Sequence, residues 1–412
     1  MHQHSRRYSV SRRGALRMGL AGAGAVALTA GIAAPAARAD RRPDGSRDER
    51  LDSALAGLVG DRDDPAVRSV AAIATVAGAD VCWRGAAGYA DRERPSRARP
   101  GVDYPYRIGS VTKAFTATVV LQLVAEGRLR LEDPIRQHLP GVVPGDDRLT
   151  VRHLLGMTSG LADFAALLFP TLRPGNSSYR EFLRAMGAPI APRDLIALAV
   201  RSGPRFEPGQ RFDYSTTNYL VLGLLLERVT GRAYAGELRR RLLVPLRLRG
   251  TELPGGPRLG PRGLRGYAHF NDREDEWVDV SDRCEQGWAG GGIVSTLSDL
   301  SRFFSALLGG RLLPAELLAA MKTSSGAPPL VPGGPDPRDY GLGLQRFAHP
   351  RGDVLWGHGG YTHGYRNTVL STSDGLDRIA LCYTGFPTRP EGPPDPAAAF
   401  LQTAVEVIRP GG

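Results

Sequence analysis

A serine and a lysine three residues apart, Ser110 and Lys113, form the first candidate for chemistry in this chain of 412 residues. A serine hydroxyl is a poor nucleophile until a neighbouring base takes its proton. At the start of a helix, positions i and i+3 lie on one face, so this spacing places an amine beside a hydroxyl. The pair therefore predicts a serine nucleophile with a lysine base, and acyl transfer as the reaction.

Lysine is rare in this chain, which makes its position informative. Of the 53 basic residues only Lys113 and Lys322 are lysines, and the others are arginines. Arginine keeps its proton in proteins, whereas a desolvated lysine can lose it. A free lysine, with a pKa of about 10.4, is neutral in only about one molecule in 2,500 at pH 7. Burial and the positive end of a helix favour the neutral amine, and a lysine held in this way can act as general base.

The elements that would position this pair follow one another as strands, then helices, then strands. A helix is predicted over 51–59 and a hairpin over 67–89. Helical patterns in the middle cover 114–126, 150–155, 193–200 and 219–229. The last part has a helix over 297–308 behind a capping box, a Pro/Gly-rich loop over 326–339, strands over 354–356, 366–371 and 377–383, and a helix over 397–408.

This order predicts a mixed α/β fold with one sheet built from both ends of the chain. The sheet region is expected over about 50–110 and 285–412, and a mainly helical region over about 111–284 is inserted between its two parts. The predicted nucleophile therefore lies where the chain leaves the sheet and enters the helical region.

The first 39 residues predict an export signal. Basic residues precede an apolar run from Met18 to Ala34, and the small residues at 37–39 offer a cleavage point. The paired Arg12 and Arg13 are typical of a twin-arginine signal. The run is shorter and less apolar than a membrane-spanning helix of about 20 residues requires. We expect a secreted domain over 40–412 without a stable membrane anchor.

Charge, cysteines and motifs exclude several other classes of protein. Six arginines and no acidic residue precede residue 40, so removal of the signal lowers the formal net charge from +11 to +5. The remaining charges are interspersed, which argues against nucleic acid as a partner. Cys82, Cys284 and Cys382 are too few and too widely spaced for a disulfide framework, and each is predicted to be a small buried side chain. No zinc motif occurs, so neither a metal nor a cofactor is expected.

The surroundings of Ser110 resemble a known family. The run from Tyr106 to Phe115, YRIGSVTKAF, is similar to the active-serine box of class C β-lactamases, D-alanyl-D-alanine carboxypeptidases and related esterases. Further boxes follow in the family's order at 150–161, 208–223, 290–300 and 357–360. Of these, 208–223 resembles the family's second catalytic box and 357–360 its third, and both names are used in this sense below. The resemblance spans roughly 50–410 and implies a β-lactamase/transpeptidase-like fold with an antiparallel sheet flanked by helices. The absence of a Gly-x-Ser-x-Gly elbow argues against the other large serine-hydrolase fold.

The resemblance also implies roles for individual residues. Tyr214 would shuttle the proton to the leaving group, as phenolate or through its hydroxyl. His358 would add a hydrogen bond or a positive charge toward the substrate carboxylate. Gly359 and Gly360 would allow a substrate backbone to approach the strand closely, and the N–H groups of Ser110 and Tyr361 would form the oxyanion hole.

One position departs from the family pattern. The second box usually carries Asn where this chain has Thr216, and a threonine side chain is shorter and makes fewer hydrogen bonds. The resemblance favours a D-alanyl-D-alanine carboxypeptidase acting on cell-wall peptides. A β-lactamase or a small-ester hydrolase would use the same machinery, and Thr216 also motivates a non-catalytic penicillin-binding or sensor protein.

Overall fold

The computed structural model describes most of the chain between Arg47 and Arg409. The described residues are 47–59, 70–92, 99–143, 147–170, 178–256, 258–260, 262–283, 286–327, 339–348, 352, 354–385 and 397–409. The predicted signal at 1–39, Cys284 and most of the predicted loop at 326–339 lie outside these ranges.

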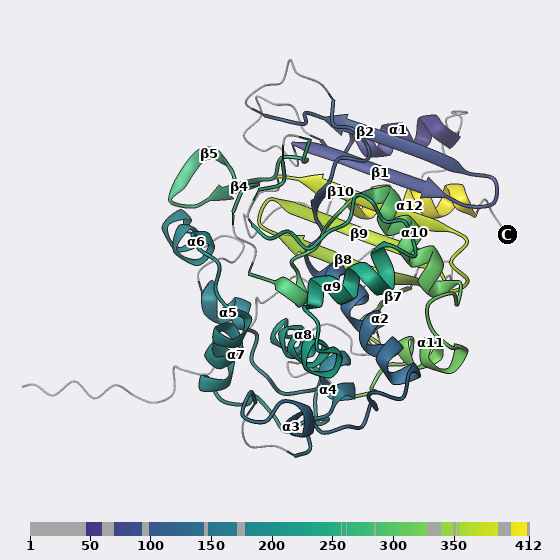
Figure 1. Cartoon of the computed structure of the whole chain (residues 1–412). Coiled ribbons are helices and arrows are strands. Elements are labelled where there is room, and N and C mark those ends of the chain that lie inside the picture. Colours follow the sequence, from purple (N-terminus) through teal and green to yellow (C-terminus); the bar gives the residue numbers. More distant parts are fainter. Residues whose placement is uncertain are drawn as a thin grey trace, which may run out of the picture.

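A six-stranded antiparallel sheet, in the order β2-β1-β10-β9-β8-β7, forms the centre of the molecule (Figure 1). Its strands are β1 (Ala71–Ala77), β2 (Cys82–Gly88), β7 (Gln345–Ala348), β8 (Val354–Thr362), β9 (Tyr365–Thr372) and β10 (Arg378–Thr384). Strand β1 pairs with β10 from Ala71 opposite Thr384 to Ala77 opposite Arg378. The two ends of the chain therefore meet inside one sheet, which confirms the predicted fold class.

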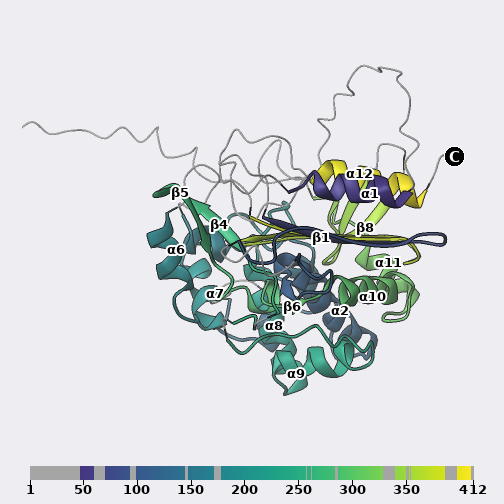
Figure 2. The same ribbon diagram turned by 90° about the horizontal axis from the view of Figure 1, so that it is seen from above.

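Two terminal helices cover one face of this sheet. The helices α1 (Arg47–Ala56) and α12 (Ala397–Ile408) lie side by side on that face (Figure 2). Successive side chains of a strand point to opposite faces, so alternate residues of β1 and β10 contribute to this layer. Its buried side chains include Leu51, Leu55, Ala72, Ala74, Val76, Leu381, Tyr383, Phe400 and Leu401.

The opposite face packs on a larger helical layer (Figure 2). Its main helices are α2 (Thr112–Ala125), α8 (Thr217–Thr230), α10 (Leu297–Leu308) and α11 (Ala315–Met321). Eleven of the fourteen residues of α2 are buried, and Phe115 stacks on Phe303 of α10 at 3.8 Å between ring centroids. Because α2 is buried on nearly all sides, the helix that follows Ser110 has a fixed position.

The remaining elements surround this layer. They are the helices α3 (Ile135–His138), α4 (Val151–Leu155), α5 (Phe164–Leu168), α6 (Tyr179–Met186), α7 (Pro192–Arg201) and α9 (Tyr234–Leu238), the short turns η2 (Gly109–Val111), η3 (Arg239–Leu243) and η4 (Trp288–Gly290), and the strands β3 (Tyr106–Arg107), β4 (Tyr267–Phe270), β5 (Arg273–Asp279) and β6 (Val294–Ser295). The hairpin of β4 and β5 was not predicted, and it lies inside the mainly helical region.

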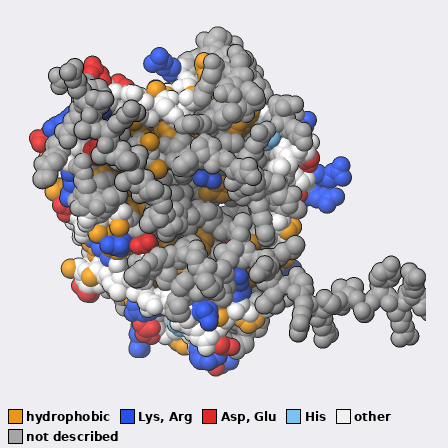
Figure 3. All heavy atoms as spheres, turned by 180° about the vertical axis from the view of Figure 1, so that it is seen from behind, with side chains coloured by type: hydrophobic (Ala, Val, Ile, Leu, Met, Phe, Trp, Pro, Cys, Tyr) orange, Lys and Arg blue, Asp and Glu red, His pale blue; other side chains and the backbone are white. Residues whose placement is uncertain are grey.

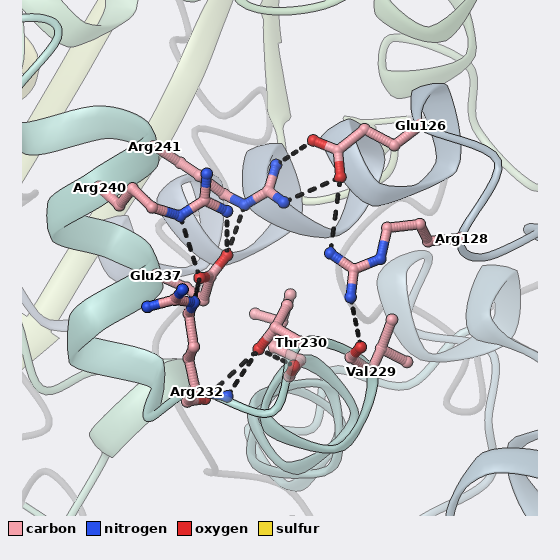
Figure 4. A network of polar contacts seen from close by, with 9 residues as sticks. Glu126, Arg128, Val229, Thr230, Arg232, Glu237, Arg240 and Arg241 are labelled. Atoms are coloured by element: carbon pink, nitrogen blue, oxygen red, sulfur yellow. Dashed lines mark hydrogen bonds and ion pairs between the residues drawn. The ribbon is translucent and has the colours of Figure 1, made fainter.

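A buried carboxylate fastens α9 to the end of α2 (Figure 4). The side chain of Glu237 is fully buried and accepts hydrogen bonds from Arg240 at 2.8 Å and from Arg241 at 2.6 Å. Arg241 also donates to both carboxylate oxygens of Glu126, the residue after α2. Burial raises the pKa of Glu237, but the two guanidinium groups outweigh it and hold this pKa below its ordinary value. The carboxylate is therefore ionised and paired, as a buried charge requires.

On the face opposite that of Figure 1, the visible basic and acidic side chains of the described residues lie scattered among one another (Figure 3). Within the described ranges, no helix combines the length and the apolar character needed to cross a membrane.

The cysteine prediction was only partly right. Cys382 is buried in β10, as predicted, whereas Cys82 is exposed at the start of β2. Residues alternate between the two faces of a strand, and position 82 is on an exposed face at the edge of the sheet. The prediction of a buried side chain was therefore wrong for Cys82.

Candidate active site

Ser110 and Lys113 lie on the turn η2 and on the first turn of α2, respectively. The Lys113 amine Nζ is 3.0 Å from the Ser110 hydroxyl Oγ. Lys113 is completely buried, and Ser110 is partly exposed. The structure therefore brings together an accessible hydroxyl and a desolvated amine, which is the arrangement that a lysine base requires.

The amine of Lys113 is held from two further sides. It donates to the carbonyl oxygen of Gly290 at 2.8 Å and to the hydroxyl Oγ1 of Thr216 at 3.4 Å. Its nitrogen also lies 5.0 Å from the centre of the Tyr214 ring. These contacts fix Nζ beside Ser110 and leave the side chain little freedom to turn away.

Tyr214 lies just before α8 and its hydroxyl hydrogen-bonds with Ser110. Burial raises the pKa of this phenol well above its ordinary value, although the bond to Ser110 lowers it in part. The phenol therefore keeps its proton at neutral pH. The raised pKa favours the hydroxyl form of Tyr214 over the phenolate, and its role as proton shuttle stays a prediction.

The second box is fastened to the loop before α5 by side chain to backbone bonds. The hydroxyls of Ser215 and Thr217 both donate to the carbonyl oxygen of Ala162, at 3.1 and 2.7 Å. The N–H of Phe164 donates to the Thr217 hydroxyl at 2.9 Å. The hydroxyls of Ser215 and Thr217 thus hydrogen-bond the second box to the segment around Ala162, as backbone groups do between paired strands.

Thr216 occupies the position where the family usually has Asn. Its hydroxyl faces Lys113 at 3.4 Å, and its methyl group packs against Gly290, where a Cβ atom would lie 2.6 Å from Thr216 Cγ2. Asn218 does not replace the missing amide, because it is buried in α8 and bonds Ser159 and Met157. The site therefore offers one weak hydroxyl contact where an amide would offer several.

The third box forms the middle of β8. Nδ1 of His358 lies 2.5 Å from the carbonyl oxygen of Gly359, so this nitrogen carries the proton. Nε2 then accepts from the hydroxyl of Tyr340 at 3.5 Å. Burial lowers the pKa of His358 to about 3, and the charge of Lys113 acts in the same direction. His358 is neutral at physiological pH and provides hydrogen bonding rather than positive charge.

The end of β8 packs directly on the turn that carries Ser110. A Cβ atom at Gly109, whose φ is +51°, would lie 2.4 Å from the carbonyl oxygen of Tyr361. A Cβ atom at Gly360 would lie 2.1 Å from the carbonyl oxygen of Ile108. Both glycines are needed for this close approach. The structure thus brings the backbone of Tyr361 next to Ser110, and their joint role as oxyanion donors stays a prediction.

Gly359 is already engaged within the protein. Its N–H donates to Oε1 of Gln345 at 2.7 Å, and its carbonyl oxygen accepts from His358. Alternate residues of a strand direct their N–H groups to the same edge, so Gly359 and Tyr361 share the edge that faces Ser110. The substrate-binding role predicted for Gly359 and Gly360 remains a prediction, and Gln345 would compete for the first of these N–H groups.

Comparison with known proteins agrees with this geometry. A family model, Beta-lactamase, matches residues 55–401. This chain belongs to the Beta-lactamase family. Among curated relatives, Penicillin-binding protein 4* of Bacillus subtilis (strain 168) is 26% identical over 312 residues, 72% of this chain and 64% of that protein. Protein flp of Staphylococcus aureus (strain COL) is 30% identical over 168 residues, 40% of this chain and 30% of that protein. The chain therefore spans less than two thirds of the length of these relatives.

Two solved structures of the Beta-lactamase fold match over almost their whole length. A D-stereospecific amidohydrolase from Streptomyces sp. is 34% identical with a TM-score of 0.73, over 90% of this chain and 100% of that chain. A D-amino acid amidase from Ochrobactrum anthropi SV3, complexed with L-phenylalanine, is 25% identical with a TM-score of 0.69, over 87% and 98%. The comparisons thus show the Beta-lactamase family and its mixed α/β fold.

Sequence analysis missed several residues that support the site of this Beta-lactamase-family chain. Gln345 holds Gly359, and Nδ2 of Asn367 donates to the carbonyl oxygens of Ile108 and Gly360 at 3.2 and 3.4 Å. Both amides are buried, on the strands β7 and β9. A buried amide at such a position is the signal that could have found them, because it must be hydrogen-bonded.

Tyr340 and Asp163 were also missed. The Tyr340 ring meets the rings of Tyr214 and His358 nearly edge to face, at 5.9 and 5.8 Å between centroids, and so fills the space between the second and third boxes. Asp163 is buried under the second box and accepts from the N–H of Thr216 at 3.1 Å. Among the described residues, no group of three or more His, Cys, Asp or Glu side chains could hold a metal ion.

Proposed function

We propose that this protein hydrolyses amide bonds that follow a D-amino acid residue, through an acyl-enzyme on Ser110. The observation that carries the proposal is the contact between the buried Lys113 amine and the Ser110 hydroxyl at 3.0 Å, beside a protonated Tyr214. The two solved structures described above, a D-stereospecific amidohydrolase and a D-amino acid amidase, support the choice of substrate class.

In the proposed reaction, Ser110 Oγ attacks the carbonyl carbon while its proton passes to neutral Lys113. The new C–O bond gives a tetrahedral intermediate whose oxyanion is stabilised by the N–H groups of Ser110 and Tyr361. When the C–N bond breaks, Tyr214 donates its hydroxyl proton to the departing amine, and its oxygen then regains a proton from the Lys113 ammonium. Water then takes the place of the amine and attacks the ester carbonyl carbon. The bond to Ser110 Oγ breaks, Oγ regains its proton, and the acid is released.

The third box favours a substrate without a charged group next to the bond that is cut. A peptide carboxypeptidase must accommodate a free carboxylate there, and a cation is the usual partner for such a group. In this chain His358 is neutral, because burial lowers its pKa to about 3. A D-amino acid amide, whose leaving group is ammonia, needs no such partner.

A D-alanyl-D-alanine carboxypeptidase is the second candidate. It was favoured by the family resemblance, and the 26% identity to Penicillin-binding protein 4* of Bacillus subtilis supports it. A β-lactamase or small-ester hydrolase would share its acylation step. These activities differ from the first proposal in the leaving group and in the charge beside it.

A panel of substrates separates these functions. The protein is assayed on D-alaninamide, D-phenylalaninamide, their L-enantiomers, and a D-alanyl-D-alanine peptide with a free or an amidated C-terminus. We expect hydrolysis of the D-amides and a preference for the amidated peptide, both lost in Ser110→Ala. Faster cleavage of the free-carboxylate peptide would assign the carboxypeptidase function instead, and full activity of Ser110→Ala would overturn the acyl-enzyme assignment.

We further propose that residues 1–39 direct export through the twin-arginine route, on the basis of the paired Arg12 and Arg13 and the apolar run that follows. The test is secretion of the full chain compared with a variant in which Arg12 and Arg13 are both lysine. We expect the variant to stay inside the cell, and equal secretion of both forms would exclude this route.

A further inference from the structure

We propose that Asp163 is a positioning residue that sets the basicity of Lys113, by placing a buried negative charge beneath the second catalytic box. This proposal rests on the acyl-enzyme function above and goes beyond it, because Asp163 belongs to none of the three boxes that carry the reaction. It touches neither Ser110 nor, in the proposed reaction, the substrate, and it acts through Lys113 and Thr216.

The position of Asp163 is fixed by two backbone bonds to one of its carboxylate oxygens. Oδ1 accepts from the N–H of Ala165 at 3.2 Å, which caps α5, and from the N–H of Thr216 at 3.1 Å. The first bond belongs to the helix that follows Asp163, and the second reaches the residue whose hydroxyl contacts Lys113. Asp163 thus connects the fold of α5 to the catalytic amine.

The second oxygen of the same carboxyl group accepts no such backbone hydrogen bond. Oδ2 of Asp163 is buried and has no hydrogen-bond partner, and the residue as a whole is only 4% exposed. A cap requires one oxygen, and Ser, Thr or Asn would provide it without burying a charge. An unpaired buried carboxylate oxygen is costly, so its presence here calls for a function other than capping.

The charged groups around Asp163 identify that function. Lys113 is close enough for its positive charge to lower the pKa of Asp163, against the larger effect of burial, which raises it. Arg205 acts in the same direction as Lys113 and forms an ion pair with Asp213 at 2.6 Å. Asp163 also raises the pKa of Tyr214, whose proton it helps to retain. The interaction with Lys113 is reciprocal, so a carboxylate at Asp163 must favour the ammonium form of Lys113.

Two opposing effects then act on the lysine. Complete burial disfavours its charged form, and a buried lysine can become a base too weak to take a serine proton. A nearby carboxylate restores proton affinity, and catalysis is best when the base titrates near the working pH. Asp163 supplies this second effect from below the site, where it does not occupy the space of the substrate.

The experiment compares pH profiles of kcat/KM for 4-nitrophenyl acetate, a substrate without a titratable group. Asp163→Asn keeps an oxygen for both backbone bonds and removes the charge, and Asp163→Ser keeps a capping oxygen in a different shape. We expect both variants to move the acid limb of the profile to lower pH by about one unit, since a neighbouring opposite charge shifts a pKa by about 1 to 3 units. Asp163→Glu keeps the charge and should retain a limb near that of the wild type.

Asp299 provides a matched control. It is also a buried aspartate near a helix start, and its Oδ2 accepts from the Gly250 N–H at 2.8 Å and the Thr251 hydroxyl at 2.9 Å. Asp299→Asn should leave the acid limb unchanged, and its melting temperature measures the cost of neutralising a buried carboxylate. Two folded neutral variants at position 163 with an unmoved limb overturn the proposal.

The outcomes also distinguish this proposal from the proposed function. If the wild type forms no acyl-enzyme with the ester or with a fluorescent penicillin, the function itself is wrong. If the wild type is acylated on Ser110 and the limb does not respond to the charge at 163, only the role of Asp163 is wrong. Should Asp163→Asn fail to fold, Asp163→Ser and Asp163→Glu still give the charged and neutral members of the comparison.

Discussion

At the scale of single residues, the site depends on side chains that are removed from water. Lys113 is completely buried, Tyr214 keeps its phenolic proton, and His358 stays uncharged because burial lowers its pKa to about 3. The burial that stabilises the fold therefore also sets the chemistry.

The lysine base leads to the first prediction. Lys113→Arg keeps the positive charge but removes the ability to give up the proton, so acylation of Ser110 should fall by about 10² or more. The rate of adduct formation with a fluorescent penicillin, read by mass spectrometry, measures this. Lys322→Arg is the control, because the only other lysine lies at the end of α11 and bonds Ser373 at 2.8 Å. Near-normal acylation of Lys113→Arg would contradict the base role.

The second prediction concerns His358 and acid. Its pKa is about 3 in the fold, against about 6.5 in an unfolded chain, so between these values only the unfolded state binds the proton. The free energy of unfolding should therefore drop by about 1.4 kcal/mol per pH unit from this residue as the pH falls below 6.5. Chemical denaturation at pH 7 and pH 5 should show a shallower pH dependence for His358→Gln. Equal slopes in both proteins would show that His358 is not held neutral.

Sequence reasoning reached the residues of the site that carry reactive groups and missed those that hold them. Ser110, Lys113 and Tyr214 stand out because their side chains suit one kind of chemistry and occur in boxes. Asn367 and Asp163 each make contacts that link distant segments, and one of the Asn367 bonds spans 259 positions of sequence. No local spacing reveals such a partner, so these residues became evident only in the folded chain.

At the scale of elements, the site is a contact between one turn and one strand. The turn η2 carries Ser110, and the end of β8 is pressed against it through Gly109 and Gly360. The sequence pattern predicted only the apolar first part of β8, because glycines and a histidine in the rest do not alternate as strand residues usually do. The hairpin of β4 and β5 was missed for a similar reason, since its second strand carries several charged residues.

This contact leads to the third prediction. A methyl group at Gly109 would collide with the backbone of Tyr361 and push β8 away from Ser110, so Gly109→Ala should lower kcat by about 10² to 10³. Gly127→Ala is the matched control, because that glycine has a φ of +69° but no atom within 4 Å of the added carbon. Steady-state kinetics and thermal melts of both variants separate backbone strain from displacement of the strand. Equal activities in the two variants would argue against a close contact at Tyr361.

At the scale of the whole molecule, the sheet joins the two ends of the chain and needs a cover on each face. The helices α1 and α12 supply that cover on one face, and α12 alone buries Phe400, Leu401 and Val405. The order of strands, helices and strands in the sequence predicted one sheet built from both ends of the chain, but it did not predict that two terminal helices cover one face of that sheet. It did not show which strands are neighbours, because pairing across the sheet depends on long-range contacts.

The fourth prediction tests this cover. A chain that ends at Gly385 lacks α12 and exposes the apolar face of β1 and β10. Each large buried side chain contributes about 1.5 to 3 kcal/mol, and the loss of several of them approaches the total stability of an ordinary domain. We expect no cooperative thermal transition by circular dichroism and no esterase activity. A chain that ends at Arg409 keeps α12 and serves as the control, and a cooperative melt of the shorter chain would show that α12 is dispensable.

The partner strand of the nucleophile is synthesised late. Asn367, which braces the backbone beside Ser110, follows it by more than half of the polypeptide. Contacts so remote in sequence slow folding and cannot form on a partly translated chain. A nascent polypeptide therefore contains Ser110 and Lys113 long before β8 and β9 are made, and the contacts that hold the backbone beside Ser110 form only late in synthesis.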